Sequence, residues 1–224
     1  MFRVEQELTK KLLPRVLLPT LSAVMAVIHP DRADLVGVTA ETIATSNFTK
    51  LASRLKRVES GRDLLRHKPR ISAETLLAAS RCEPGTLGHM YADFMIRRGF
   101  QPQDRPPVRF IRDTESQYVA IRCREVHDLL HVLFDCPTTL PGELAIKAIE
   151  FTQYELPAHW GSAYFASGRL NRRERKYLAS TVLPWAVRAA GKATVLLSMN
   201  DEKAFNKPII ELRKLWRIET MQPS

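Results

Sequence analysis

The sequence has little glycine, few cysteines and no long apolar run, and each shortage narrows the choice of fold. Nine glycines in 224 residues, with few runs of alternating apolar residues, indicate no β-sheet. Cys82, Cys123 and Cys136 are widely spaced and form no CxxC pair, which argues for a reducing compartment and against a disulfide scaffold. The most apolar stretch, 16–28, contains Pro19 and is shorter than the ~20 residues that a membrane-spanning helix needs.

Negative charge is also scarce relative to positive charge. The chain has 34 Lys and Arg against 24 Asp and Glu, a net charge of +10. Such an excess favours an anionic partner: nucleic acid, an anionic membrane surface or an acidic small molecule. No nucleic-acid partner is expected, because the sequence has no reader motif and no interleaving of aromatic and basic residues. The basic run 169–176 suits anionic lipid headgroups, although a solvated helix face is an equal alternative.

Helical periodicity dominates the rest of the chain. Ser72 and Asp113 are expected N-caps, Gly99 ends one helix, and Pro157 and Pro184 break or kink two others. We therefore predict an all-α, single-domain protein over residues 1–224, a bundle-like array of helices with a flexible N-terminal segment at 1–11. Helices are expected over 12–28, 39–55, 70–79, 87–98, 113–136, 143–154, 169–188, 189–197 and 208–215.

The stretch that carries chemistry is His127-Asp128-Leu129-Leu130-His131, followed after eleven residues by Glu143. Positions i and i+4 share one face of a helix, so the two imidazoles can bind one metal ion. The turn at 137–142 brings the next helix back, which lets Glu143 face them. Asp128 lies ~100° around the helix from His127 and joins only by leaning across the groove. We predict a metal site between these two helices, with zinc favoured and iron or manganese possible.

A bare HxxxH pattern is common on helix surfaces, but here the flanking residues are apolar. Buried polar groups need partners, and four ligand-type groups within reach of one point favour a metal. Glu150 lies seven residues after Glu143, on the same helix face. It is a candidate for orienting a histidine, and a plain salt bridge with Lys147 or Arg124 is an equal alternative.

The pattern HDxxHx11E resembles that of the ubiquinone (coenzyme Q) biosynthesis Coq family numbered fourth. The resemblance covers roughly 12–218 and includes all four metal positions. Further matching residues lie on both sides of the motif: Pro84 to Gly88, Tyr91, Arg109 to Ile111, Asp113, Glu115, Tyr118, Val119, Arg122, Arg124, Glu125, Val126, Pro137, Thr138, Gly142, Lys147, Glu150, Gln153, Leu156, Pro157 and Pro184 to Ala186.

The resemblance implies a zinc-binding peripheral protein on the matrix side of the mitochondrial inner membrane, in a complex of quinone-biosynthetic enzymes. It also implies a decarboxylase that removes the carboxylate at carbon 1 of prenylated 4-hydroxybenzoate-type precursors, a reaction that is oxidative in one version. Asp128 and Glu143 are then the candidate catalytic groups. A homo-oligomer remains open.

Two other function classes compete with the lyase. One is a scaffold that holds a lipid and neighbouring enzymes, with a purely structural metal. The other is a zinc peptidase, which fits poorly because such enzymes have Glu, not Asp128, after the first histidine. A metal with an open coordination position would favour the lyase over the scaffold.

Overall fold

The computed structural model describes residues 45–105, 107–156, 170–199 and 202–221. All regular structure in these ranges is helical, apart from one isolated bridge between Thr86 and Pro208, which confirms the all-α fold. The buried apolar side chains form one continuous core. The α-helices are α3 (Thr45–Leu55), α4 (Glu59–His67), α5 (Ala73–Ala79), α6 (Leu87–Arg98), α7 (Thr114–Phe134), α8 (Leu140–Tyr154), α10 (Arg172–Tyr177), α11 (Leu183–Lys192) and α12 (Ile209–Leu215).

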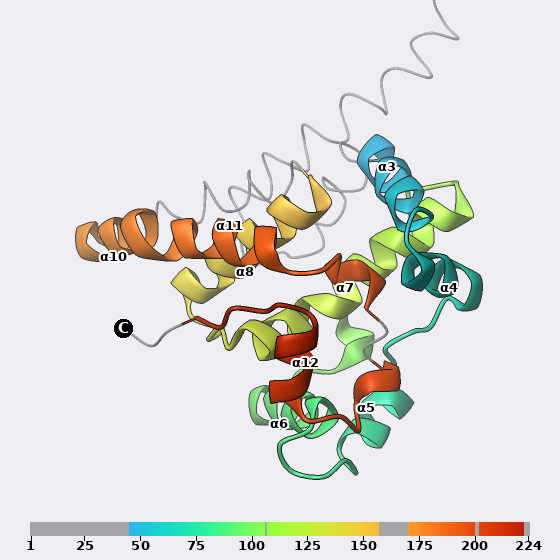
Figure 1. Ribbon diagram of the computed structural model, residues 1–224, viewed down its shortest axis with the longest axis horizontal. Coiled ribbons are helices and arrows are strands. Elements are labelled where there is room, and N and C mark those ends of the chain that lie inside the picture. Colours follow the sequence, from blue (N-terminus) through green and yellow to red (C-terminus); the bar gives the residue numbers. More distant parts are fainter. Residues whose placement is uncertain (1–44, 106, 157–169, 200–201, 222–224) are drawn as a thin grey trace, which may run out of the picture.

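Helix α7 is the centre of the arrangement and packs against α3, α6 and α8 (Figure 1). Its start follows the expected cap, because the Asp113 carboxylate accepts a hydrogen bond from the Ser116 amide at 2.8 Å. It ends where Asp135 adopts a left-handed conformation with φ 55°, which reverses the chain toward α8. Helix α11 then covers α8.

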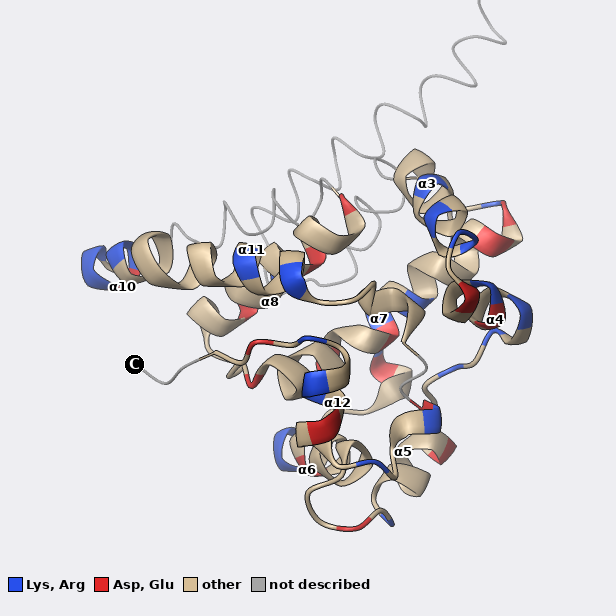
Figure 2. Cartoon of the chain, viewed as in Figure 1, with Lys and Arg blue, Asp and Glu red and all other residues tan. Residues whose placement is uncertain are grey.

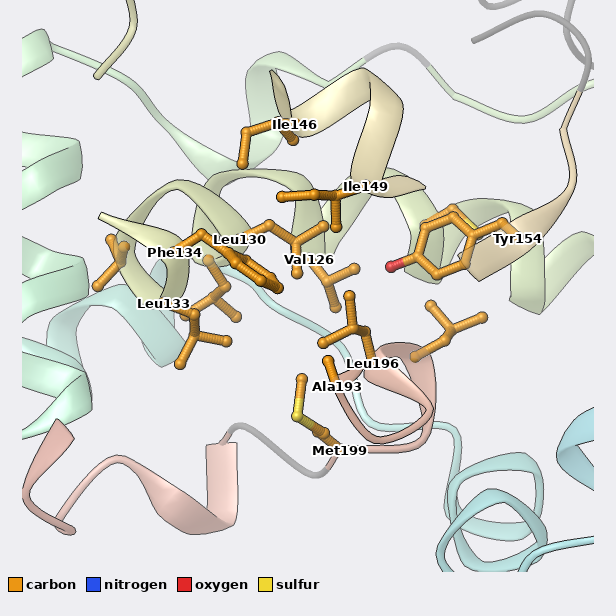
Figure 3. Close-up of a cluster of buried hydrophobic side chains, with 14 of the residues drawn as sticks. Val126, Leu130, Leu133, Phe134, Ile146, Ile149, Tyr154, Ala193, Leu196 and Met199 are labelled. Carbon is orange, nitrogen blue, oxygen red and sulfur yellow. The ribbon is translucent and has the colours of Figure 1, made fainter. Parts of the chain in front are cut away.

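Apolar side chains from both helices fix α7 against α8. Leu130 and Phe134 of α7 and Ile146 and Ile149 of α8 are at most 1% exposed and lie in one cluster (Figure 3). Each large side chain of this kind contributes about 1.5–3 kcal/mol when it is buried. The polar groups of the site are therefore carried by two helices whose register is set by apolar packing.

The chain between α7 and α8 makes a close turn that requires glycine. A Cβ atom at position 142 would lie 1.9 Å from the Pro137 carbonyl oxygen, too close for any other residue without a backbone shift. Helix α8 begins at Leu140, three residues before the predicted start, because Pro141 fits the first helical turn. Glu143 consequently lies in the first turn of α8.

Several other predicted elements need correction. Helix α4 was not predicted: Leu64 and Leu65 are its only buried large apolar residues, so few apolar positions mark it in the sequence. The helix predicted over 169–188 is divided, because a π-helical turn at Leu178–Val182 separates α10 from α11. Over 189–197, α11 ends at Lys192 and a short 3₁₀ turn follows at Leu196–Ser198.

Some predictions fall outside the part of the chain that the structure describes, namely the segment 1–11, the helix 12–28, residues 39–44 and Pro157. Within that part, no helix combines the length and the apolar character needed to cross a membrane.

Candidate metal centre

The two helices bring three of the predicted ligands to one point. The ligand atoms of His127, His131 and Glu143 all lie within 4.8 Å of one another. Glu143 bridges the histidines: its Oε2 is 3.4 Å from His127 Nε2, and its Oε1 is 3.3 Å from His131 Nε2. The i, i+4 spacing on α7 and the first turn of α8 produce the convergence that the sequence predicted.

Each imidazole is oriented through its other ring nitrogen. His127 Nδ1 lies 2.9 Å from Glu150 Oε1, and His131 Nδ1 lies 3.1 Å from the Cys136 carbonyl oxygen. Since both partners are acceptors, the two Nδ1 atoms carry the protons and donate them. The Nε2 atoms then face Glu143, which is the orientation that a metal-binding histidine needs.

The Nε2 atom of His131 is the clearest sign of a missing partner. It is buried and makes no hydrogen bond with any described residue, and the side chain is only 1% exposed. A buried polar atom without a partner is costly, so the site fits a cation that accepts its lone pair.

The charges around His127 and Glu143 favour a cation as well. Burial and Lys147 both lower the pKa of His127, but contacts with the Glu150 and Glu143 carboxylates outweigh them and raise it to about 9. Burial alone would raise the pKa of Glu143, yet the contacts with His127 and His131 hold that pKa far below its usual range. In the metal-free protein, a proton on His127 thus balances part of the carboxylate charge.

Aromatic and basic side chains close one wall of the site, and the other side is open. The Phe94 ring stacks on His131 with centroids 5.6 Å apart, and the Arg98 guanidinium lies 4.0 Å above Phe94. The side chain of Glu143 is 36% exposed and that of His127 21% exposed. A ligand can therefore approach from the side of these two residues.

Asp128, the fourth predicted ligand, is held by a different partner in this structure. Its Oδ2 accepts a hydrogen bond of 2.6 Å from Arg105 Nη2, and the same guanidinium nitrogen lies 3.4 Å from the hydroxyl of Tyr91. The structure therefore brings His127, His131 and Glu143 together and places Asp128 in an ion pair beside them.

For Glu150, both predicted roles hold at once. One oxygen faces His127, and the other receives Lys147 Nζ at 3.0 Å. The Cys136 thiol is buried, and burial raises its pKa to about 12, so its contribution to the site is the carbonyl oxygen. His159 and Trp160 lie outside the described residues. Sequence reasoning missed Arg105 and Phe94, which no motif identifies.

Two imidazoles and one carboxylate form a donor set that zinc accepts, and iron or manganese also bind such sets. The geometry fits a site with three protein ligands and room for a fourth.

Comparisons with known proteins identify the family to which the chain belongs. Residues 5–222 match the family described as "Coenzyme Q (ubiquinone) biosynthesis protein Coq4". The mitochondrial ubiquinone biosynthesis protein COQ4 homolog of Aedes aegypti is 35% identical over 94% of this chain and 77% of its own length. The mitochondrial coq4 protein of Aspergillus niger is 40% identical over 88% of this chain and 69% of its own.

A crystal structure described as a putative ubiquinone biosynthesis protein from Nostoc punctiforme shares the fold, with a TM-score of 0.71. It covers 88% of this chain and 95% of its own, at 20% sequence identity. On the strength of the family match and of relatives at 35–40% identity, the chain belongs to the coenzyme Q (ubiquinone) biosynthesis Coq4 family.

Proposed function

We propose that this protein acts in ubiquinone biosynthesis as a metal-dependent lyase that decarboxylates carbon 1 of a prenylated 4-hydroxybenzoate-type ring. The observation that supports it most is the cluster of His127, His131 and Glu143 with a buried, unpartnered Nε2 and one open side. A closed structural site would have four protein ligands, whereas catalytic sites keep a position for substrate or water. The family and the relatives' names support the pathway.

The residues of the site would have two roles: some hold the metal, and others transfer the proton. His127, His131 and Glu143 would hold a divalent metal, while Glu150 and the Cys136 carbonyl orient the imidazoles. A bound metal supplies Lewis acidity and orients the substrate oxygens. The hydroxyl para to the carboxylate pushes electron density to carbon 1. A proton adds there, the bond to the carboxylate breaks, and its electron pair restores the aromatic ring as CO₂ leaves.

Asp128 and Glu143 are the carboxylates that would move this proton. Asp128 sits beside the cluster on Arg105, and Glu143 belongs to the cluster and is partly exposed. In an oxidative version, one atom of molecular oxygen would become a hydroxyl at carbon 1, and a two-electron reductant from outside the chain would be needed to take the other atom to water. Zinc supplies no redox chemistry, so oxygen would have to attack the electron-rich ring directly, unless the native metal is another one.

The protein is also proposed to work as a peripheral protein on the matrix side of the mitochondrial inner membrane, within a complex of ubiquinone-biosynthetic enzymes. The relatives are named mitochondrial. Helix α10 supports contact with an anionic surface, since Arg172, Arg173, Arg175 and Lys176 are exposed along it at one end of the molecule (Figure 2). Flotation with anionic liposomes tests this: binding should weaken with salt, because exposed charges are screened, and no binding at low salt would contradict it.

The decisive test of the activity supplies purified, metal-loaded protein with the prenylated acid and measures CO₂ release. Wild type should release CO₂, and the Glu143→Ala protein should not. If neither releases CO₂ but wild type restores ubiquinone synthesis in cells lacking the family member, the protein is a scaffold with a structural metal. If Glu143→Ala also restores synthesis fully, metal chemistry at this site is not the function.

A further inference from the structure

A cavity of about 610 Å³ lies beside α7 and is lined by residues of that helix and of the segments 70–74 and 102–108. Its apolar wall is formed by Ile71, Val108 and Ile121, and its polar wall includes Arg105 and Glu125. On α7, Ile121, Glu125 and Asp128 are spaced three or four residues apart, so the cavity follows the helix face that leads to Asp128. Arg105, which lines the cavity, also contacts Asp128 on this face.

The polar groups of the cavity suit a ligand that has a negative charge near Arg105 and a hydrogen-bond donor near Glu125. Arg105 carries an always-positive guanidinium, 15% exposed, that is already engaged with a single carboxylate, Asp128. Glu125 is paired with Arg70 through Oε1 at 2.6 Å. Its Oε2 is buried, makes no hydrogen bond among the described residues and lies 4.0 Å from Arg122. Together with the aliphatic wall, this set fits an aromatic ring that bears a carboxylate and a hydroxyl.

Arg105 is the link between this cavity and the metal centre. Its Nη2 donates to Asp128 Oδ2 at 2.6 Å, and it also lines the cavity. Asp128 directly follows His127 in the sequence and lies three residues before His131, so His131 is its neighbour on the helix surface. The guanidinium thus holds the carboxylate that lies between the two histidine ligands in the sequence.

We propose that the cavity binds a hydroxylated aromatic carboxylate, which takes Arg105 from Asp128 and so releases Asp128 toward the metal. Arg105 is then a positioning residue that couples occupation of the cavity to the state of the metal centre. The inference rests on the proposed function, since the ligand is the head group of the proposed substrate. A ligand that changes the binding of a second ligand must itself be bound more tightly when the second is present, so the coupling is measurable without turnover.

The test measures Co²⁺ affinity, and the visible spectrum of bound Co²⁺, with and without 4-hydroxybenzoate. In wild type, the acid should raise Co²⁺ affinity about tenfold and change the spectrum, because Asp128 joins the metal. In Arg105→Gln, Co²⁺ affinity should already be raised and the acid should have no further effect. In Asp128→Asn, the acid should bind without changing Co²⁺ affinity. Arg112→Gln is the matched control, an exposed arginine of the same segment outside the cavity lining, and should behave as wild type.

Two results would overturn the proposal. The first is a wild type in which the acid leaves Co²⁺ affinity and spectrum unchanged, a measurement that does not depend on any variant folding. The second is coupling that persists in Arg105→Gln, which would mean that the acid binds the metal directly. Loss of coupling with intact CO₂ release refutes only this inference, and intact coupling without CO₂ release refutes only the proposed reaction.

Two further ligands test the chemistry of the cavity. Benzoate should bind about tenfold more weakly than 4-hydroxybenzoate, because it has no hydroxyl to donate to the Glu125 carboxylate. Equal affinity for the two acids would show that Glu125 does not contact the ligand. Inorganic phosphate, which has no ring for the aliphatic wall, should be weaker still, and an effect equal to that of 4-hydroxybenzoate would overturn the assignment to an aromatic acid.

Discussion

Helix α7 carries two buried polar clusters that are built in opposite ways. Around Arg122, oppositely charged side chains pair with each other. The Arg122 guanidinium is 0% exposed and makes two hydrogen bonds, of 2.5 and 3.1 Å, to Glu202. Glu125, beside it, is paired with Arg70. Around His131, by contrast, the ligand atoms of two imidazoles and one carboxylate converge on one point, as they would around a metal ion.

From this difference we infer that the Arg122 cluster stabilises the fold, whereas the histidine cluster binds a ligand. The Arg122 cluster joins α7 to the segment around Glu202 and balances its charges within the chain. Both clusters contain a buried atom without a hydrogen bond, Glu125 Oε2 in the first and His131 Nε2 in the second, but the histidine cluster gathers lone pairs and leaves Glu143 partly exposed. Unfolding experiments should therefore respond to the first cluster, and metal binding to the second.

Removing Arg122 should have the largest effect on stability. Arg122→Met leaves the Glu202 and Glu125 carboxylates without their buried partner, at a cost of about 3–5 kcal/mol in the free energy of unfolding. Urea denaturation measures it. The control is Arg54→Met, because Arg54 pairs with Glu155 on the surface, where the loss should be about 0.2–1 kcal/mol. Equal losses in the two variants would abolish the distinction between the clusters.

Removing His131 should instead act on the metal. His131→Ala deletes one of three ligands, and we expect Zn²⁺ affinity to fall at least about 100-fold, more than the 10–100-fold cost of losing an orienting partner. Elemental analysis after dialysis measures the bound metal. His67→Ala, which removes an exposed histidine of α4, should keep wild-type metal content. Full metal content in His131→Ala would rule out the site.

The pH dependence of stability should differ between metal-free and metal-bound protein. The pKa of His127 is raised to about 9 from its usual 6.5, so its contribution is fully present below pH 6.5 and is lost as pH rises through 9. In metal-free protein this loss should be on the order of 3 kcal/mol. Bound metal replaces the proton, so the loss should disappear.

Urea midpoints between pH 6 and 9.5, with chelator or with Zn²⁺, measure this dependence. Subtracting the same curves for His127→Ala removes the contribution of other titrating groups. A metal-free difference curve that stays flat across this range would show that Glu143 and Glu150 do not hold a proton on His127.

Much of the fold follows from local signals in the sequence. The caps Ser72 and Asp113 and the terminating Gly99 mark helix ends in the structure as predicted, because capping depends on neighbouring residues alone. Helix α4 and the π-helical turn before α11 escaped prediction. The first has few apolar residues, and the second depends on how α11 packs against α8.

The residues of the site divide in the same way, into those that local sequence signals predict and those whose contacts depend on the folded chain. His127, His131 and Glu143 converge because helix periodicity and one short turn place them together, and both can be read from residue spacing. The partner of Asp128 cannot be read in this way, since Arg105 comes from the proline-containing segment 23 residues earlier. Long-range contacts of loop residues depend on the folded chain, so the ion pair that holds Asp128 away from the cluster had no signal in the sequence.

The smallest predicted effect concerns Glu150, which shares features with both kinds of cluster. Glu150 is 1% exposed and contacts a cation, Lys147, through one oxygen and a metal-ligand candidate, His127, through the other. Glu150→Gln keeps the size of the side chain but removes its charge, so it should hold His127 less firmly and make the imidazole a weaker ligand. Zn²⁺ affinity should fall about tenfold, the lower end of the range for orienting partners. Glu155→Gln, an exposed neighbour just after α8, should leave affinity unchanged. If Glu150→Gln lowers the free energy of unfolding of the metal-free protein but leaves Zn²⁺ affinity intact, Glu150 belongs with the Arg122 type of cluster; if affinity falls, it belongs to the metal centre.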